Sequence, residues 1–551
     1  MNPDSNGSTT VADVVGATLA RLGADQVFGV VGSGNFHVTN ALIRNGASFV
    51  ATRHEGGAAT AADAYARVSG RVGVVTVHQG CGLTNAMTGI AEAAKSRTPM
   101  IVLAAEPAAT AVRSNFRVDQ DALARAVGAV SERVHGAASA VTDTVRAWRL
   151  AESERRTVVL NLPLDVQAAS AELTDLPQAI PVAPPRASDE AVRALADLLA
   201  DAERPIFIAG RGARGARAEI TALAARCGAL PATSAAAKGL FADDEWNLDV
   251  SGGFATPVAA ELISSADLVV AWGASLNMWT SRHGSLIGPG TTVVQVDLDP
   301  SAPGAHRPVD LGIVGDARLT AIAVSDALPG ERVGYRTDAV RAVLRTGARW
   351  RDVAYRDEGD AAHIDPRTLT IGLDDLLPPQ RVVAVDSGNF MGYPSMFLAV
   401  PDHRGFCFTQ AFQSVGLGLA SALGAALAEP GRLPVAACGD GGFLMGIAEL
   451  DTIHRLGVGM LIVVYNDEAY GAEVHHFGPH GHALDTVVFP ETDIAAIARG
   501  HGCTAVTVRT PADLAPVAQW LAGPRDTTMV IDAKVAPDRP SWWLAEAFRG
   551  H

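Results

Sequence analysis

The sequence of 551 residues has few cysteines, few aromatic residues, and no long run of apolar or basic residues. Its five cysteines are odd in number and lack CxxC spacing, which argues against a disulfide framework or a zinc site. With a net charge of -15 and no basic cluster, the chain lacks the positive surface that nucleic acids and anionic membranes attract. No segment approaches the ~18 apolar residues of a membrane span, and the polar N-terminus has no signal-peptide pattern. We therefore expect a cytoplasmic protein that binds neither nucleic acid nor membrane.

Short apolar runs alternate with helical patterns along most of the chain. Hydrophobic residues make up 48% and charged residues 19%, a composition typical of globular α/β proteins, and the length predicts about three domains. Strands that alternate with helices predict parallel sheets covered on both faces. We expect three open parallel-sheet domains over residues 1–175, 188–335 and 364–551, with a Pro-rich linker from Leu176 to Ser188 and a helix plus linker from Gly330 to Asp365.

The most specific motif lies in the third of these domains, where strand VAACGD is followed by a helix and by strand MLIVVYND. Asp440 and Asn466 then stand at carboxyl ends of strands, the rim at which open α/β sheets bind ligands. Gly439, Gly441 and Gly442 would let the backbone approach phosphate oxygens beside a helix N-terminus. A hard cation such as Mg²⁺ would use Asp440 and Asn466 as ligands. The alternative is a tight glycine turn with a capping Asp, which the strand, helix and strand order disfavours.

This segment resembles the diphosphate-binding signature of thiamine diphosphate (ThDP) enzymes of the acetolactate synthase, pyruvate decarboxylase and benzoylformate decarboxylase group. The resemblance covers nearly the whole chain and implies pyrimidine-binding, central nucleotide-binding-like and diphosphate-binding domains, in that order. It implies that Asp440, Asn466 and the backbone carbonyl of Glu468 ligate Mg²⁺. Many relatives have Asn-Asn where this chain has Asn466-Asp467, which leaves the first Asn intact. Further cofactor contacts are expected from the glycines of the motif and from Gly388, Asn389 and Tyr470.

Two other positions would complete the cofactor site. Glu55 follows SFVATRH and precedes the small-residue segment GGAATAADAYARVSG. In the family, a Glu at this place protonates N1′ of the aminopyrimidine and so promotes removal of the C2 proton; taken alone, Glu55 could be a surface carboxylate. Segment VGLGLASALGAA is similar to the one that bends the cofactor, which makes Val415 the apolar wedge, the alternative being a core Val in a helix. Because the family places Glu55 and the metal site on different subunits, we expect a homodimer or homotetramer.

Polar residues near the expected reaction centre favour decarboxylation. Ser33 in VVGSGN and His78 in HQGCG match positions where benzoylformate decarboxylase has Ser and His, and His can relay protons near neutrality. Glu473 is placed like a Glu that protonates or steers the intermediate in pyruvate decarboxylases. For His475 and His476 we prefer proton relay or recognition of a substrate carboxylate to a second metal site; plain solvent exposure is the alternative.

The resemblance implies a ThDP- and Mg²⁺-dependent enzyme that acts on a 2-oxo acid through a C2-carbanion and an enamine. The reaction is non-oxidative decarboxylation, carboligation with an aldehyde or ketone acceptor, or both. The alternatives are an acetolactate-synthase-like transferase, a 2-hydroxyacyl-CoA lyase-like enzyme, a flavin oxidoreductase and a ThDP-fold protein without turnover. Segment GASLNMWTSR lacks the Arg that follows Gly-Ala in flavin-containing acetolactate synthases, and GRGARG is a weak dinucleotide fingerprint. We therefore do not expect FAD.

Overall fold

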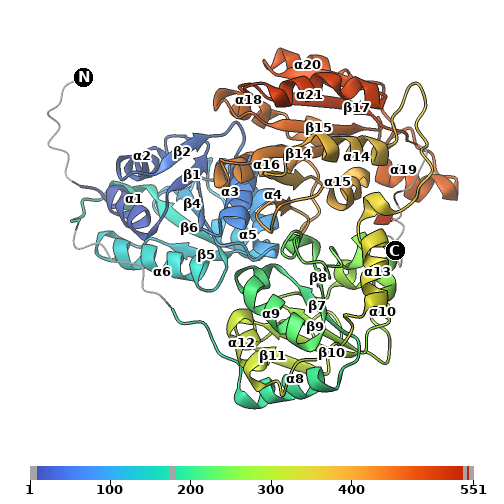
Figure 1. Cartoon of the computed structure of the whole chain (residues 1–551). Helices are drawn as coiled ribbons and strands as arrows, with labels where there is room; N and C mark the ends of the chain where they lie inside the picture. Colours follow the sequence, from blue (N-terminus) through green and yellow to red (C-terminus); the bar gives the residue numbers. More distant parts are fainter. Residues whose placement is uncertain (1–8, 174–181, 538–540, 542, 545–551) are drawn as a thin grey trace.

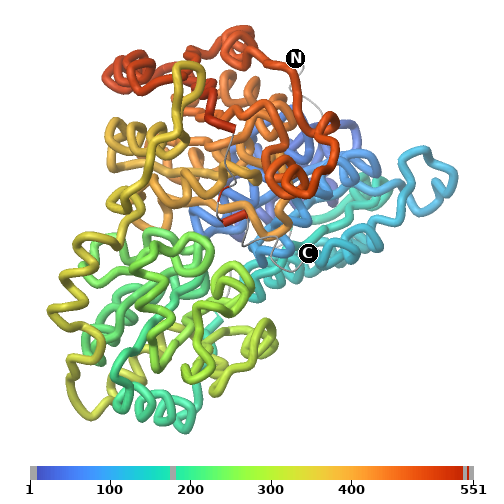
Figure 2. The backbone as a smooth tube through the Cα atoms, turned by 90° about the vertical axis from the view of Figure 1, so that its right-hand side faces the viewer, coloured from blue at the N-terminus to red at the C-terminus, as the bar shows by residue number. Residues whose placement is uncertain are grey.

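The structure, a computed structural model, describes residues 9–173, 182–537, 541 and 543–544. The chain forms three lobes, with the first third, the middle and the last third of the sequence each in its own lobe (Figures 1 and 2). The first part of the predicted Pro-rich linker, residues 176–181, lies outside the described residues. Among the described helices, none has the length and apolar character needed to cross a membrane.

The first domain is a six-stranded parallel sheet of order β2-β1-β3-β4-β6-β5. Its central strands are fully buried, as expected for a parallel sheet with helices on both faces. Its strands are β1 (Gln26–Gly29), β2 (Ser48–Ala51), β3 (Gly73–Val77), β4 (Met100–Glu106), β5 (Val130–Arg133) and β6 (Thr157–Pro163). Its helices are α1 (Val11–Leu22), α2 (Phe36–Arg44), α3 (Glu55–Ser69), α4 (Cys81–Lys95), α5 (Gln120–Ala126), α6 (Ala140–Glu152) and α7 (Leu164–Ala168).

The central domain is a five-stranded parallel sheet of order β11-β10-β9-β7-β8. Ser188 caps its first helix by accepting a hydrogen bond from the N–H of Ala191, and α13 lies in the stretch predicted as helix plus linker. Its strands are β7 (Pro205–Ala209), β8 (Leu230–Thr233), β9 (Leu268–Trp272), β10 (Thr292–Asp297) and β11 (Leu311–Val314). Its helices are α8 (Asp189–Asp201), α9 (Arg217–Cys227), α10 (Pro257–Ser264), α11 (Met278–Ser281), α12 (Ala317–Ala327) and α13 (Asp338–Gly347).

The third domain is a six-stranded parallel sheet of order β13-β12-β14-β15-β17-β16. Three parallel-sheet α/β domains confirm the predicted fold class. The strands are β12 (Arg381–Val385), β13 (Phe406–Phe408), β14 (Leu433–Gly439), β15 (Leu461–Asn466), β16 (Thr504–Val508) and β17 (Met529–Lys534). The helices are α14 (Pro366–Leu376), α15 (Gly392–Phe397), α16 (Gly418–Ala428), α17 (Asp440–Met445), α18 (Ala448–Arg455), α19 (Gly471–Phe477), α20 (Ile494–Gly500) and α21 (Ala515–Ala522).

The single helix predicted after Gly442 is wrong in one respect, because the chain forms two helices, α17 and α18, with a break at Gly446. A Cβ at Gly446 would lie 2.8 Å from the carbonyl oxygen of Gly416, so the two segments approach each other closely at the break. Tertiary packing therefore divides a segment that the sequence pattern joins.

Helices α3 and α16 join the first and third domains. A Cβ at Gly424 on α16 would lie 2.0 Å from the carbonyl oxygen of Ala61 on α3, so only small residues allow this approach. One hydrophobic core runs through both domains at this contact. An ion-pair network accompanies it: the guanidinium of Arg67 lies 2.7 Å from Asp63 and 2.6 Å from Glu92, and donates to the carbonyl of Phe408 at 2.8 Å. The interface is thus held by close helix packing and by buried charges.

Candidate functional site

The residues predicted to bind diphosphate and metal meet at the carboxyl ends of three adjacent strands of the third sheet. Gly439 is the last residue of β14 and Asn466 the last of β15, while the turn from Asp386 to Asn389 follows β12. Strand β14 pairs with both β12 and β15, so the three loops are neighbours. The predicted placement of Asp440 and Asn466 at strand ends is confirmed.

Oxygen atoms suited to a hard cation gather at this edge. Burial raises the pKa of Asp440 to about 6 and that of Asp467 to about 7, the charge of Asp440 adding to the second shift. A divalent cation would supply the missing positive charge. The amide nitrogen of Asn466 donates to Asp532 Oδ1 at 2.8 Å, which fixes the side-chain orientation of Asn466.

The backbone of Glu468 has the strained left-handed conformation, with φ of 57°. Its carbonyl accepts a hydrogen bond from the N–H of Phe489 at 2.8 Å and keeps a second lone pair for another partner. A carboxylate, an amide oxygen and a backbone carbonyl are the donors that Mg²⁺ prefers, so the residues fit the expected ion. Among the described residues, no group of three or more His, Cys, Asp or Glu side chains offers a different metal site.

Close packing around the glycines leaves no space for side chains. A Cβ at Gly442 would lie 2.4 Å from Asp386 Oδ2, and one at Gly441 would lie 2.8 Å from the ring of Tyr470. Gly388 has a φ of 146°, which L side chains rarely adopt. Asn389 lies beside Asp467 and next to Gly471. These features fit a backbone cradle for an anionic group, with Tyr470 at its side.

Val415 lies at the surface just before α16 and is 39% exposed. A Cβ placed on Gly442 would approach Val415 Cγ1 to 3.3 Å, so Val415 borders the glycine turn. Met445, which lies against the next residue, Gly416, is 57% exposed. This exposure excludes the alternative of a core Val in a helix, and it agrees with an apolar group that faces a ligand.

A second group of predicted residues lies in the first domain. Glu55 is the first residue of α3, is half-buried, and accepts a hydrogen bond from the side chain of Asn85 on α4 at 3.0 Å. His78 Nδ1 accepts a hydrogen bond from the N–H of Gly34 at 3.1 Å, so the ring proton of the neutral form is on Nε2. Burial lowers the pKa of His78, although Glu55 acts in the opposite direction. Ser33 is exposed beside this loop.

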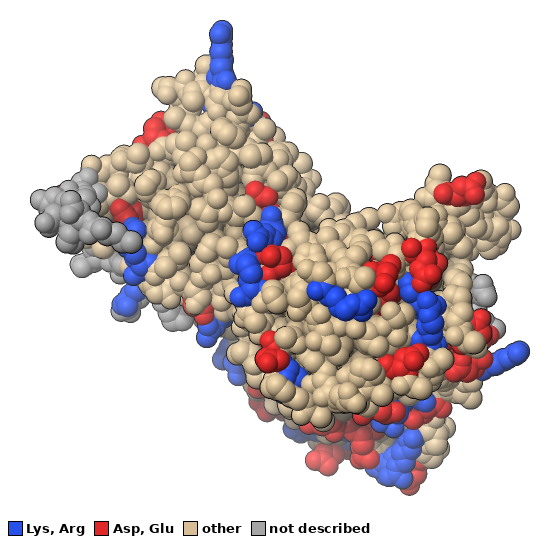
Figure 3. Space-filling view, turned by 90° about the horizontal axis from the view of Figure 1, so that it is seen from above, with Lys and Arg blue, Asp and Glu red and all other residues tan. Residues whose placement is uncertain are grey.

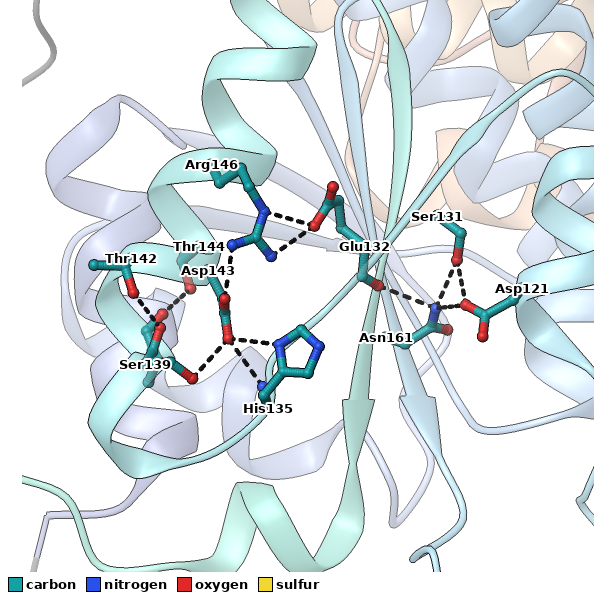
Figure 4. A network of polar contacts seen from close by, with 11 residues as sticks. Asp121, Ser131, Glu132, His135, Ser139, Thr142, Asp143, Thr144, Arg146 and Asn161 are labelled. Atoms are coloured by element: carbon teal, nitrogen blue, oxygen red, sulfur yellow. Dashed lines mark hydrogen bonds and ion pairs between the residues drawn. The ribbon is translucent and has the colours of Figure 1, made fainter.

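A chain of buried amides supports the loop after β3, which carries His78. The N–H of Gly80 donates to Gln120 Oε1 at 3.1 Å, and Gln120 donates to Asn161 Oδ1 at 2.8 Å. The Asn161 amide then donates to Asp121 and Ser131 (Figure 4). Sequence reasoning missed Gln120 and Asn161. The signal available was Asn161 as a lone polar residue in the apolar strand TVVLNLP.

Glu473, His475 and His476 all lie on α19 and are half-buried. Glu55 and His78 make their hydrogen bonds within the first domain, while Asn466 makes its hydrogen bonds within the third. The expected cofactor residues are therefore divided between two half-sites, one on the first domain and one on the third. The catalytic roles of these residues remain predictions.

A cavity of about 1550 Å³ lies where the three domains meet, at the carboxyl ends of β7 and β9. Arg97, Arg155 and Arg211 line it. Burial, together with Arg155 and two further arginines, holds the pKa of Arg211 well below its usual range. The negative charge of Asp63 acts in the opposite direction on the Arg211 pKa but does not outweigh these causes. This arrangement favours an anion in the cavity.

Three domain families match the chain. They are the thiamine pyrophosphate enzyme N-terminal TPP binding domain over residues 9–127, the thiamine pyrophosphate enzyme central domain over 192–324, and the thiamine pyrophosphate enzyme C-terminal TPP binding domain over 386–533. Each match falls on one of the three sheets.

Curated relatives match over most of their length. A probable 2-ketoarginine decarboxylase of Pseudomonas aeruginosa is 32% identical over 514 residues, which cover 90% of this chain and 88% of the relative. A sulfoacetaldehyde acetyltransferase of Rhodobacter capsulatus is 28% identical over 525 residues, covering 90% and 88%. The acetolactate synthase isozyme 2 large subunit of Escherichia coli is 29% identical over 463 residues, covering 82% of each chain.

Proposed function

The chain belongs to the thiamine pyrophosphate enzyme family, and we propose that it is a Mg²⁺-dependent 2-oxo acid decarboxylase or carboligase with ThDP as its cofactor. The observation that carries this proposal is the meeting of three loops at adjacent strand ends of the third sheet. There, the half-buried carboxyl of Asp440, whose pKa is raised by burial although Lys534 acts in the opposite direction, lies beside a glycine turn too tight for side chains. This edge is suited to a diphosphate and its metal ion.

Bound ThDP supplies a nucleophilic carbon that adds to the substrate carbonyl and accepts the electrons released with CO₂. The chain's own groups would do the rest. Asp440, Asn466 and the Glu468 carbonyl hold the ion, and the glycines cradle the diphosphate. Glu55 holds a proton at the pyrimidine ring, and neutral His78 presents its Nε2–H to a substrate oxygen, because its Nδ1 is occupied by Gly34. Ser33, Glu473, His475 and His476 would complete the pocket.

We propose that a second copy of the chain brings the two half-sites together. Large apolar side chains are exposed near both, including Phe116 at 41% beside His78 and Met445 at 57% beside Gly416. Figure 3 shows a broad area of one face that carries few charged side chains. Sedimentation velocity of the purified protein tests this association, and a strictly monomeric active enzyme would contradict it.

The decisive test compares Glu55→Gln with Glu203→Gln, a control whose side chain is 79% exposed. Both variants are incubated with ThDP, Mg²⁺ and a panel of 2-oxo acids, alone and with acceptor aldehydes, and products are identified by mass spectrometry. We expect Glu55→Gln to lose roughly 10²- to 10⁴-fold in CO₂ release, the range for a lost acid-base group. Full activity of Glu55→Gln would overturn the proposal.

Two relatives favour a transferase as the second candidate function, because their names describe an acetyltransferase and an acetolactate synthase. The same incubations separate the two. Free aldehyde indicates protonation of the intermediate, whereas a ligated product without free aldehyde indicates transfer to an acceptor.

We also propose that the cavity between the three domains holds a phosphate-containing ligand, since Arg97, Arg155 and Arg211 line it and the neighbouring arginines lower the pKa of Arg211. Thermal shifts with ADP and with FAD test this, with Arg211→Met as the variant expected to abolish the shift. The prediction that FAD is not the ligand is tested by the visible absorption of the purified protein.

A further inference from the structure

The segment that presents Val415 is held at both ends by buried carboxylates. It connects β13 to α16. At its start, the N–H groups of Ala411 and Phe412 donate to Glu92 Oε1 and Oε2 at 3.1 and 2.6 Å. At its end, the N–H of Gly416 lies 3.1 Å from both oxygens of Asp386, and the next N–H donates to Oδ1 at 3.1 Å. Side chains thus replace the main-chain partners that a strand or helix would provide.

Both carboxylates are fully buried and come from different domains. Glu92 lies on α4 of the first domain, and Asp386 follows β12 in the third; neither is accessible to solvent. Hydrogen bonds from backbone amides to a carboxylate are stronger than bonds between neutral groups, and a dry environment strengthens them further. Between them, Gln413 has the strained left-handed conformation, with φ of 59°, and Gly416 has a φ of 93° that favours glycine. The conformation of the segment therefore depends on the two anchors.

The position of Val415 follows from these anchors. Val415 directly precedes Gly416, whose N–H contacts Asp386, and Asp386 also touches the position of Gly442 in the glycine turn. The Asp386 carboxylate thus holds the segment that presents Val415, which we call the wedge loop. It also holds its own turn by accepting a hydrogen bond from the N–H of Ser387 at 2.8 Å, and it packs against the glycine turn at Gly442. Burial raises the pKa of Asp386 to about 6, against the backbone N–H groups that lower it.

We propose that Asp386 and Glu92 are positioning residues that set the position of Val415 relative to the cofactor. The proposal rests on the proposed function, since it assumes that Val415 contacts ThDP. A displacement of about 1 Å between reacting groups can cost on the order of 100-fold in rate, so the anchors would affect the cofactor without touching it.

A double-mutant cycle with Asp386→Asn and Val415→Ala tests whether Asp386 affects the cofactor through Val415. The first readout is amide hydrogen exchange of residues 409–418 in the protein without cofactor, and the second is the C2 proton exchange rate of bound ThDP by NMR. We expect Asp386→Asn to speed amide exchange in this segment and to slow C2 exchange about tenfold or more. In the Val415→Ala background it should slow C2 exchange by less than about twofold, because coupled residues are not additive.

Asp365→Asn is the matched control. Asp365 is also buried in the third domain and accepts backbone N–H groups of Glu358 and Arg367 at 3.0 and 2.8 Å, but it caps α14. This variant should lower the free energy of unfolding without changing amide exchange in residues 409–418 or the C2 proton exchange rate of bound ThDP. Should Asp386→Asn fail to fold, Glu92→Gln replaces it in the double-mutant cycle, because Glu92 holds the other end of the same segment.

The outcomes are separable. If the wild-type protein does not bind ThDP or exchange its C2 proton, the proposed function fails, while the amide exchange still decides whether the carboxylates hold the segment. Unchanged amide exchange in the Asp386→Asn protein overturns the inference. So does a loss of C2 exchange that adds fully to the loss caused by Val415→Ala, because the carboxylate would then act by another route.

Discussion

Replacing Arg67 with Met should weaken the contact between the first and third domains. The Arg67 side chain is 7% exposed, and its guanidinium lies against Asp63 and Glu92, whose side chains are fully buried. Met retains much of the apolar stem but leaves two carboxylates in the interior without a countercharge. Breaking a buried ion pair by removing one partner costs about 3–5 kcal/mol. The lost hydrogen bond to the Phe408 carbonyl acts in the same direction.

For domains of this size, 1 kcal/mol shifts the melting temperature by roughly 2–4 °C, so the variant should melt roughly 6–20 °C below the wild type. The assay is scanning calorimetry at one fixed rate, because large multidomain proteins often unfold irreversibly. Arg133→Met is the control: Arg133 also pairs with two carboxylates, those of Glu106 and Asp121, but is 29% exposed. Its loss should cost about 1 kcal/mol or less. A shift for Arg67→Met no larger than for Arg133→Met would refute the reasoning.

The loss should also depend on pH. Burial raises the pKa of Asp63, although the charge of Arg67 acts in the opposite direction. Burial also acts to raise the pKa of Glu92, but Arg67 and two backbone N–H groups outweigh it, so that this pKa is lowered. Without Arg67, the pKa of Asp63 should rise further above the ordinary 3.8, and that of Glu92 should rise above the ordinary 4.5. The folded state then binds protons that the unfolded state has released, so stability falls as pH rises through this range. The difference from wild type should therefore be larger at pH 7.5 than at pH 5. A constant difference would contradict this explanation.

Three further changes have defined outcomes. Gly442→Ala should weaken ThDP binding about tenfold or more in fluorescence titration, because its Cβ would lie 2.4 Å from Asp386 Oδ2. Asp532→Ala should lower Mg²⁺ affinity about 10- to 100-fold in calorimetric titration, because it frees the Asn466 amide. His78 has a lowered pKa, so its neutral form stabilises the fold above the ordinary value of 6.5, and this contribution is lost as pH falls through the lowered pKa. His78→Gln should flatten the decline of melting temperature between pH 7 and 5.

The first of these changes has a matched control in Gly431→Ala, since a Cβ there meets nothing within 4 Å and Gly431 lacks a positive φ. Equal ThDP affinity of the Gly431→Ala and Gly442→Ala proteins would contradict the proposal that the glycine turn binds the diphosphate. For Asp532→Ala, unchanged Mg²⁺ affinity would show that the Asn466 amide holds its orientation without this partner. A pH profile of His78→Gln parallel to that of the wild type would exclude His78 as the titrating group.

The strand ends of the third sheet could be predicted from sequence because each carries its own local signal. A buried apolar run that stops at Gly439-Asp440, and another that stops at Asn466, fix both residues at the sheet edge whatever the rest of the fold does. The Ser188 cap was predictable for the same reason. The break between α17 and α18 was not, because it depends on the backbone of Gly416, a residue outside the segment.

The roles of Asp386 and Glu92 in holding the wedge loop could not be predicted from sequence either, because their partners are distant along the chain. Nothing in the sequence links Asp386 to its partners Gly416 and Leu417, since their N–H groups reach it only through the fold. Glu92 lies in a helix whose pattern gives no sign of a distant loop. Arg67 did carry a signal: with Asp63 it forms an i,i+4 pair inside a helix rich in small residues, a setting in which charges are buried and must be paired.

The small residues of α3 and the charges of Arg67 and Glu92 serve the same contact. Small side chains let α3 approach α16 until backbone nearly meets backbone at Gly424, but a surface of alanines has few features that fix one register over another. The ion pairs supply that register, because Arg67 reaches only one set of carboxylates. Glu92, held by Arg67, also holds the wedge loop at Phe412. The register of the domain contact and the position of Val415 are thereby set by one carboxylate, so a substitution that loosens the contact should alter both melting temperature and cofactor chemistry.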